Sequence, residues 1–392
     1  MRDGWVETTL GEVADVIDPH PSHRAPAVDE NGIPFIGIGD LRKTGDIDFA
    51  KARRVSRDIL EEHKSRYDRS EFLIGLGRVA SIGMVVRLPD ENIEYVVSPT
   101  LAVIKAREVM GQFLFYLLEG PHSQEQFQRF KKGSTRESVG MQILRKIKVQ
   151  VPPLPEQKRI VDLISSVDSY IEALQKQLES AKRSRNAVLH ELLTAGGEGW
   201  VETTLDGIAE YINGYPFKPS DLGDVGLPVI RIKQLLDPHE PVDRTETGTP
   251  DRCLLRDGDI VFSWSGTLAV RIWNRGPAKL NQHLFRVVEK EGVYKGIIPL
   301  ILDHAIEQLE EKSHGTTMKH ITKQTLLPHK VLLPPPPEQK RIVEIINTID
   351  EFISQTELTT SKAQNLRSGL LSDLLSGEHE IPSTYDEVMG AA

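Results

Sequence analysis

The chain has only one cysteine, Cys253, among its 392 residues. A single cysteine excludes an intramolecular disulfide and a cysteine-rich zinc site. No run of 18 apolar residues occurs, so the sequence predicts no membrane span. The first residues, MRDGWVETTLGEV, also lack the apolar core of a secretory signal. Together these absences predict a cytoplasmic protein.

Motifs of catalysis are also scarce. The sequence has no GxxxxGK phosphate loop, which argues against an ATPase, and no proline–proline–aromatic motif of adenine methyltransferases. His23, His63 and His190 lie in unrelated segments, without the spacing or the carboxylates of a metal site. The run IGIGD at Ile36–Asp40 hints at a cofactor loop, but no βαβ unit surrounds it, and we interpret it as a strand. We therefore expect no enzyme activity, no metal and no cofactor on this chain.

Positive charge is in the minority, with 48 Lys and Arg residues against 57 Asp and Glu residues and a formal net charge of −9. This balance argues against a chain that is basic all over. It does not exclude nucleic acid as a partner, because binding depends on local patches rather than on the total charge. The 39% hydrophobic and 27% charged content is ordinary for a soluble globular chain of two or three domains.

The most informative feature present is a stretch that occurs twice. VPPLPEQKRIV fills residues 151–161, and LLPPPPEQKRIV fills residues 332–343. The prolines end the preceding element, because proline lacks an amide hydrogen and restricts the residue before it. Each stretch then continues into apolar residues spaced alternately four and three apart, which is the seam of a coiled coil. The residues that we expect at a helix-pair interface are Ile160, Ile164, Val167, Ile171, Leu174 and Leu178 in the first copy, and Ile342, Ile346, Ile349, Ile353, Leu370 and Leu374 in the second.

Two such helices in one chain can cover each other. A helix of about 38 residues is roughly 57 Å long, and its apolar stripe is unstable alone in water. Because a globular segment separates the two helices, we expect them to pair antiparallel, as a coiled coil with pseudo-twofold symmetry. The alternatives are another long helical hairpin, or a helix pair that binds a further protein.

The antiparallel register makes a specific prediction for the two arginines of the seam. It places Arg185 near Asp350 and Arg367 near Asp168, so that both charges find partners. It also places the larger side chains of the first helix opposite smaller ones, with Leu174 and Leu178 facing Thr360 and Thr356.

The remainder of the chain is also duplicated. GWVETTL occurs at Gly4–Leu10 and again at Gly199–Leu205. Further matches follow in order, with an offset that falls from 195 to 182 residues, and most of the shortening lies between Thr44 and Arg69. The sequence therefore predicts a globular part, a long helix, a second globular part and a second long helix. Within the globular parts, short strands accompany helices expected at Gly111–Arg129 and Gly292–Lys312.

This layout resembles the specificity (S) subunit of a type I restriction–modification system. The twin proline–EQKRIV leaders, the twin GWVETTL starts and the GSTR and GTTM segments carry the resemblance, which covers the full length. It implies an α+β fold with two α/β target recognition domains and a pair of long antiparallel helices. The implied boundaries are 1–151 for the first recognition domain, 152–194 for the first spacer helix, 195–333 for the second domain, 334–376 for the second helix and 377–392 for a polar, loosely ordered tail.

The resemblance also implies a function. Each globular domain would read one half of a bipartite target in double-stranded DNA, while the helices set the spacer and dock two methyltransferase (M) subunits. Restriction (R) subunits would complete the complex. S-adenosylmethionine, ATP and Mg are then expected on partner subunits only, and the chain itself is not an enzyme.

Base reading needs polar side chains on loops, and phosphate contacts need basic or hydroxyl side chains. A basic run around Lys43 and the pairs of matching polar loops supply the candidates. The DNA-binding residues that we predict are Lys43, Arg78, Ser98, Thr100, Lys132, Ser134, Thr135 and Arg136 in the first half, and Lys233, Gln234, Trp264, Ser265, Thr267, Asn281, Gln282, His283, Thr316, Thr317, Lys319 and His320 in the second. Lys233 and Gln234 are expected to close a strand.

Each candidate also has a structural interpretation. Ser134 and Thr316 are suitable helix caps, residues 98–100 are typical of a polar turn, Trp264 is typical of a core, and a charged run is usually a solvated face. For the whole chain, the rival hypothesis is a coiled-coil protein-interaction scaffold with no DNA contact. A related system with different nuclease partners also stays open.

Overall fold

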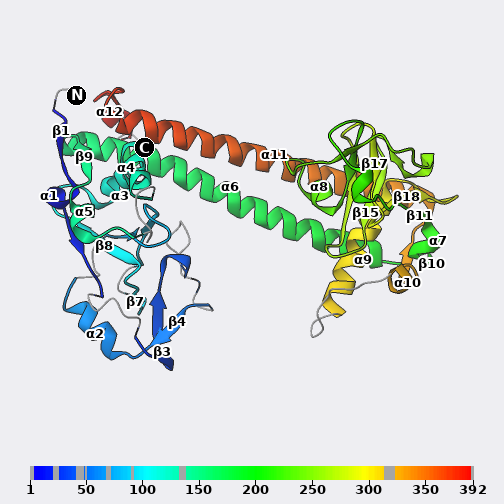
Figure 1. The fold of residues 1–392 in the computed structure, drawn as a ribbon, viewed down its shortest axis with the longest axis horizontal. Helices are drawn as coiled ribbons and strands as arrows, with labels where there is room; N and C mark the ends of the chain where they lie inside the picture. The colour runs from blue at the N-terminus through cyan, green and yellow to red at the C-terminus, as the bar shows by residue number, and fades with distance from the viewer. Residues whose placement is uncertain are drawn as a thin grey trace. The chain divides into compact units, whose positions relative to one another are not determined.

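The computed structural model describes residues 4–20, 26–40, 48, 51–67, 72–89, 92–131, 138–312 and 323–389. The chain divides into two compact units (Figure 1). Unit 1 combines Met1–Leu174 with Thr359–Ala392, and unit 2 is Gln175–Leu358. Each unit therefore contains one globular part and portions of both long helices, and both ends of the chain belong to unit 1.

The globular part of unit 1 is built from short strands in small sheets. One sheet has the order β2-β8-β5-β6, another has β4-β3-β7, and β1 pairs with β9. Strands β3 and β7 are parallel, whereas the other pairs of these sheets are antiparallel. The strands are β1 (Val6–Thr9), β2 (Ala14–Ile17), β3 (Val28–Ile36), β4 (Arg53–Val55), β5 (Leu73–Gly77), β6 (Val85–Arg87), β7 (Val96–Val97), β8 (Leu101–Ala106) and β9 (Lys148–Val151).

The globular part of unit 2 repeats this topology. The sheet orders are β11-β18-β15-β16 and β13-β12-β17-β14, and β10 pairs with β19. The parallel pair recurs as β12 and β17. The strands are β10 (Val201–Thr204), β11 (Ala209–Asn213), β12 (Leu227–Ile230), β13 (Arg244–Thr245), β14 (Leu254–Leu255), β15 (Ile260–Ser263), β16 (Ala269–Ile272), β17 (Ala278–Leu280), β18 (Leu284–Glu289) and β19 (Lys330–Leu333). The duplication predicted from sequence is thus a duplication of fold.

Short helices connect and cover the strands, and they differ from prediction in two places. The helix expected at 111–129 is two helices, because Gly120 adopts an extended conformation ahead of Pro121, which disfavours a helical residue before it. The helix expected at 292–312 begins only at Ile297, after a turn at Gly292. The short helices are α1 (Leu10–Val13), α2 (Asp58–Lys64), α3 (Gly111–Glu119), α4 (Pro121–Lys131), α5 (Met141–Arg145), α7 (Leu205–Ile208), α8 (Ile232–Leu236), α9 (Ile297–Lys312), α10 (Lys323–Leu326) and α12 (Tyr385–Met389), with 3-10 turns η1 (Ile38–Asp40), η2 (Pro219–Asp221) and η3 (Asp251–Cys253).

The interpretation of Ile36–Asp40 as a strand was wrong beyond its first residue. Strand β3 ends at Ile36, and η1 follows. The Asp40 carboxylate accepts a hydrogen bond from the Gly37 amide at 2.9 Å, and the Asp40 amide donates to the Gly37 carbonyl at 3.0 Å. These local bonds compete with a ladder and turn the chain out of the sheet.

The long helices are α6 (Leu154–Thr194) and α11 (Pro336–Leu375), with 41 and 40 residues. Their leaders, which share the run EQKRIV, dock to the globular parts through one glutamine each. Gln157 accepts a hydrogen bond from the Met110 amide at 2.9 Å and donates to the Pro152 carbonyl at 2.9 Å. Gln339 does the same with the Tyr294 amide and the Pro334 carbonyl. Buried glutamines thus satisfy the backbone groups where chain segments meet.

The two repeated motifs also bind each other. Trp5 of the first GWVETTL donates from its indole Nε1 to the carboxylate of Glu156 at 3.2 Å. Trp200 of the second copy donates to Glu338 at 3.0 Å. Each glutamate lies in the first turn of its long helix, where a carboxylate is favoured by the helix dipole. The motifs therefore fix the start of each long helix against the first strand of its own unit.

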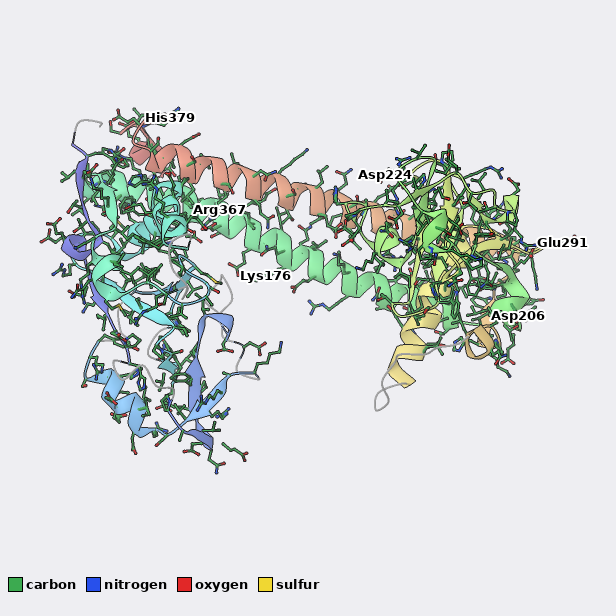
Figure 2. The ribbon with its side chains drawn as sticks, viewed as in Figure 1. Lys176, Asp206, Asp224, Glu291, Arg367 and His379 are labelled. Carbon is green, nitrogen blue, oxygen red and sulfur yellow. The ribbon has the colours of Figure 1, made fainter. Side chains whose placement is uncertain are left out.

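In unit 1, the first part of α6 packs against the last part of α11 (Figure 1). Ile171, Leu174 and Ala363 form a buried apolar cluster between them. Arg367 forms ion pairs with Asp168 and, at 2.8 Å, with Glu119 of α3. Figure 2 shows Arg367 on the side of α11 that faces α6. Burial alone lowers the pKa of Arg367, but the two carboxylates more than compensate and raise it.

In unit 2, the last part of α6 packs against the first part of α11. Arg185 donates two hydrogen bonds to Asp350, one of them at 3.1 Å, and Lys182 pairs with Glu357 at 2.6 Å. The partner numbers fall as the α6 numbers rise, so the helices are antiparallel. The predicted ion pairs of Arg185 and Arg367 are both confirmed. Thr356 and Thr360, the small residues of the predicted register, are buried.

The expected interface residues differ in burial. Leu178, Val167, Ile349 and Leu370 are half-buried, and the other predicted members are buried. Residues near the helix ends, such as Ile160 and Ile346, join the cores of the globular parts rather than a separate seam.

The prediction of a loosely ordered tail was wrong for residues 377–389. Ile381 is buried in the core of unit 1, and α12 follows it. Arg159 of α6 donates to the Asp386 carboxylate at 3.0 and 3.2 Å and to the Ile381 carbonyl at 3.1 Å. The Ile381 side chain and the bonds from Arg159 therefore hold this segment against unit 1.

The described residues contain neither a candidate membrane span nor a candidate metal site. No helix among them is both long and apolar enough to span a membrane. No group of three or more His, Cys, Asp or Glu side chains in the described ranges is arranged to hold a metal ion.

Candidate nucleic-acid interface

In unit 2, several loops meet at one end of the two larger sheets. We call this surface loop edge 2 and define it as residues 213–218, 231–236, 263–268 and 281–283. The loops follow β11, β12, β15 and β17, whose pairing brings these strand ends together. Backbone bonds join the loops: the Tyr215 amide donates to the Leu280 carbonyl at 2.7 Å, and the Gln282 amide donates to the Tyr215 carbonyl at 3.1 Å. Loop edge 2 is therefore an ordered surface made from distant parts of the sequence.

Gly214 makes this close approach of loops feasible. A Cβ atom on Gly214 would lie 2.3 Å from the Asn281 carbonyl oxygen and 2.4 Å from that of Leu280. Real Cβ atoms do not come this near, so any larger residue forces the 213–218 and 281–283 loops apart. Glycine is needed here for a packing reason that a single sequence does not reveal.

Aromatic rings border loop edge 2. Trp264 stacks on Phe285 of the core at 5.6 Å between centroids, and His283 lies 6.2 Å from Trp264. Tyr215 and Phe217 contact each other edge to face at 5.0 Å, and each is half-buried. Trp264 is thus neither wholly core nor wholly exposed. Rings held in this way present flat faces and edges to a ligand.

The predicted polar residues of loop edge 2 fall into two groups. Thr267, Gln282, His283 and Lys233 are exposed, and Ser265 is half-exposed. These are the side chains that a ligand can reach.

The other two predicted residues are buried. The Asn281 carboxamide accepts from the His283 amide, and the Gln234 carboxamide bonds the Pro241 carbonyl and the Arg231 amide. Lys233 and Gln234 lie in α8 rather than at the end of a strand, because Gln234 caps that helix. Buried amides of this kind shape the loops.

Unit 1 has the equivalent surface, loop edge 1, which we define as residues 18–20, 37–40, 78–82 and 98–100. Arg78 pairs with Asp18 at 3.1 Å and donates to the Val139 carbonyl at 3.3 Å. Its backbone bonds Thr100 and Val139. Arg78 is buried, so its charge holds three segments together and does not project outward.

The Ser98 and Thr100 hydroxyls lie 3.1 Å apart, and the Thr100 amide donates to the Ser98 hydroxyl. Ser98 is buried and Thr100 is half-buried. Residues 98–100 therefore form the polar turn that was the alternative interpretation, with Thr100 nearest to solvent.

Loop edge 1 contains a strained residue. Ala80 has a φ of 59°, the left-handed region that disfavours non-glycine residues. The matching loop of unit 2 has Gly266 there, with a φ of 74°. Both loops share this turn geometry, but in unit 1 the residue is an alanine, whose Cβ atom disfavours it. Strain of this kind is often retained where a loop conformation matters for binding.

A basic groove adjoins loop edge 1. It has a volume of about 690 Å³, borders β2, and contains Arg66, Arg107 and Arg145 together with Asp15 and Asp18. Arg107 pairs with Asp15 at 3.5 Å, and Arg145 donates to the Val16 carbonyl. Sequence reasoning missed these arginines because they come from three separated segments.

Sequence reasoning also missed Tyr215, Phe217 and Lys218 of loop edge 2. The signal available was the run NGYPFK, in which turn residues alternate with aromatic and basic ones. Several predicted residues lie outside the described ranges, namely Lys43, Lys132, Ser134, Thr135, Arg136, Thr316, Thr317, Lys319 and His320.

Comparison with known families identifies the repeated unit. The model of the type I restriction modification DNA specificity domain matches residues 2–183 and again residues 197–366. The chain belongs to this family. Each match to the specificity domain contains one GWVETTL start and one proline leader.

The chain is similar in sequence to named specificity subunits. The chain is 24% identical over 382 residues to the putative type I restriction enzyme MjaX specificity subunit of Methanocaldococcus jannaschii, with 92% of this chain and 87% of that protein covered. It is 26% identical over 178 residues to the type I restriction enzyme EcoBI specificity subunit of Escherichia coli, covering 43% and 35%.

Solved structures share the fold. A chain from a study of complex assembly and conformational transition of the type I R-M system matches with a TM-score of 0.61 at 19% identity, covering 95% of this chain and 98% of that one. The S subunit from M. genitalium matches with a TM-score of 0.55 at 16% identity, covering 96% and 97%.

Proposed function

We propose that the chain is the DNA sequence-recognition subunit of a type I restriction–modification complex, in which loop edge 1 reads one half of a bipartite target and loop edge 2 reads the other. The chain itself carries out no chemistry. It acts in the cytoplasm, and the methyl donor, ATP and Mg belong to partner subunits.

One observation carries the proposal. The two units share strand topology, helix leaders and tryptophan–glutamate contacts, yet the loops at the same end of their sheets carry different side chains at matching positions. Ser98 and Thr100 stand where unit 2 has Asn281 and His283, and Arg78 begins a loop that in unit 2 begins with Trp264. A constant frame with unlike loops is what two unlike half-sites require.

The exposed side chains of loop edge 2 are suited to base edges. Gln282 offers a carboxamide that can bond adenine with two hydrogen bonds, and His283, Ser265 and Thr267 offer single donors or acceptors. Lys218 and Lys233, both exposed, are placed to contact phosphates. The buried Asn281 and Gln234 fix the loops that present them.

Loop edge 1 presents fewer free side chains. Thr100 and Ser81 are among its half-buried polar groups, and the groove with Arg66, Arg107 and Arg145 supplies positive charge beside them. We assign phosphate contacts to this groove and a positioning role to Arg78 and Ser98, because these two side chains are buried and hydrogen-bonded.

Two methyltransferase subunits and restriction subunits are the partners we propose, with the methyltransferases docked on the long helices. The helix surfaces retained between the two units fit a partner present in two copies. Tyr170 of α6 and Phe352 of α11 occupy equivalent positions, and their exposed fractions are 52% and 46%. Exposed aromatic side chains are typical anchors of protein interfaces.

A domain exchange tests the proposal. Residues 11–150 are replaced by the corresponding segment of another specificity subunit, and the complex with its methyltransferase subunits is supplied with genomic DNA. Sequencing of methylated adenines should show that one half-site changes and the other stays. A complex that keeps its whole original target contradicts the proposal.

A double substitution serves as the matched test in unit 2. Gln282→Ala with His283→Ala should relax the second half-site only, because these exposed side chains do not hold the loop. Salt-sensitive, sequence-dependent DNA binding also separates this function from a protein-interaction scaffold, which would show neither property.

A further inference from the structure

The C-terminal segment covers a surface of unit 1 whose counterpart in unit 2 is open. In unit 1 this surface lies at the start of α6 and consists of Lys158, Arg159, Asp162 and Leu163, of which Arg159 is covered and Lys158 stays exposed. Their counterparts, each 182 positions later at the start of α11, are Lys340, Arg341, Glu344 and Ile345. Three of these pairs carry the same charge, and the fourth is aliphatic in both units.

The contacts in unit 1 define what this surface binds. Ile381 inserts into the core that contains Ile160 and Ile164, and Leu163 packs against the same core. Five residues further on, Asp386 receives two hydrogen bonds from Arg159. Tyr385 is half-buried beside them. The segment is therefore bound mainly through the Ile381 side chain and the Asp386 carboxylate.

The contacts also explain the path of the segment. Gly377 has a φ of 72° and lies against the ring of Trp5, which turns the chain away from α11 toward the start of α6. His379, labelled in Figure 2, lies on this connecting stretch. Ile381 itself is buried, whereas Glu380 and Ser383 on either side of it are exposed.

The open surface keeps the features that do the binding. The Arg159 side chain is only 13% exposed, whereas Arg341 is an exposed residue, as are Lys340 and Glu344. Beneath them, Val343 and Ile342 are buried in the unit 2 core, as Val161 and Ile160 are in unit 1. An aliphatic residue, Ile345, is left half-exposed beside the arginine.

We propose that the surface formed by Lys340, Arg341, Glu344 and Ile345 is a docking site for a segment of a partner chain with the chemistry of residues 381–386, an aliphatic side chain followed five residues later by a carboxylate. The chain's own segment fills the corresponding surface in unit 1 and leaves this one for the partner. The two units thereby offer different surfaces to a partner even though their helices are alike.

A peptide of residues 377–389 with a fluorescent label is the probe, and the full chain is the protein. Fluorescence anisotropy without DNA should show one site per chain. Arg341→Ala should weaken binding about tenfold, the effect of losing a charge-assisted hydrogen-bond pair. Lys362→Ala, which removes an exposed cation elsewhere on α11, should leave binding unchanged.

Two further variants make the assignment specific. A peptide with Asp386→Arg should bind Arg341→Asp protein and not the wild type. The full chain with Ile381→Ala and Asp386→Ala, whose own segment no longer holds its place, should bind two wild-type peptides instead of one.

The proposal is overturned if no peptide binds the full chain at millimolar concentration, or if Arg341→Ala and Lys362→Ala proteins bind it equally well. Because no DNA is present, either failure leaves the proposed recognition function untouched. Failure of the domain exchange, in turn, leaves the docking site standing.

Discussion

At the scale of single residues, glycine and buried amides decide the shape of the loops that face outward. Gly214 allows two loops of loop edge 2 to touch, and Asn281 and Gln234 use their side chains to bond the backbone. The groups predicted to read bases thus divide into those that reach solvent and those that hold the loops. Only residues of the first group can be substituted to change the DNA target without disturbing the loops.

Gly214→Ala tests this division. The added Cβ meets two carbonyl oxygens, so we expect a loss of about 1–3 kcal/mol in the free energy of unfolding, as for an overpacked site, and weakened DNA binding. Gly223→Ala is the matched control, because a Cβ on Gly223 meets no atom within 4 Å. Urea denaturation and band-shift titration measure both. Equal stability of the two variants would sink the packing argument.

Asp303 gives a pH-dependent prediction. Burial raises the pKa of its carboxyl to about 6, although Arg185, 3.9 Å away, opposes the shift. A raised pKa means that the folded state holds the proton more tightly, so stability from this group is present below the ordinary pKa near 4 and is lost as pH rises through 6. The side chain keeps 36% exposure, so the effect is small.

Asp303→Asn removes this ionisation. The melting temperature of the variant, relative to wild type, should therefore be higher at pH 7.5 than at pH 4.5. Asp224→Asn, at an exposed site, should show the same difference at both pH values. An Asp303→Asn difference that does not change with pH would contradict the assignment.

At the scale of elements, ion pairs hold the long helices together where a charged residue interrupts the apolar seam. In unit 1 the seam has Arg367 in place of an apolar residue, and Asp168 and Glu119 neutralise it. Side-chain exposures of 22% for Arg367 and 21% for Glu119 mean that an unpaired carboxylate would be poorly solvated. Removing one partner of such a set costs more than its formation contributes.

Arg367→Ala should lower the free energy of unfolding by about 2 kcal/mol. Lys362→Ala, which removes an exposed cation from the same helix, should change it by less than about 0.5 kcal/mol. Chemical denaturation measures both, and adding Asp168→Ala to Arg367→Ala should cost less than the sum of the single changes. Additive costs would show that the pair does not interact.

Sequence patterns predicted the elements whose cause is local or periodic. The seam spacing predicted the helices, and their antiparallel register predicted that Arg185 pairs with Asp350, 165 residues away. The break at Gly120–Pro121 was readable from the proline but was overlooked.

Other features depend on contacts that no local pattern contains. Ile381 lies in a mostly polar segment, and it is buried in a core built from distant residues, while Arg159, 222 residues away, bonds its carbonyl. The surfaces at loop edges 1 and 2 likewise combine four segments each. Candidate site residues could be named individually, but which of them are buried, as Arg78 and Ser98 are, requires the packing.

At the scale of the whole molecule, both long helices contribute to both units. If they set the gap between half-sites, as proposed, then their length should control the DNA target. Seven residues inserted after Leu174 and seven after Leu358 preserve the seam, because its repeat is seven, and lengthen the helices by about 10 Å.

The insertion should lengthen the permitted gap by about three base pairs and leave both half-sites unchanged. Sequencing of methylated adenines in DNA treated with the complex reads this directly. Inserting seven residues into α6 alone is the control, since the Arg185–Asp350 and Arg367–Asp168 pairs can then no longer form together, and it should reduce the yield of folded protein. If the double insertion leaves the gap between the half-sites unchanged, the helices do not act as the spacer.

The contact between Trp5 and Gly377 has a consequence for synthesis of the protein. Unit 2 is one uninterrupted stretch of the chain, whereas unit 1 combines residues that are synthesised before and after unit 2. Ile160 and Ile164 therefore lack part of their cover until residues 371–381 are synthesised. Synthesis of unit 1 begins before that of unit 2, but its folding is completed later. Unit 1 is therefore the unit exposed to chaperones and proteases in the interval.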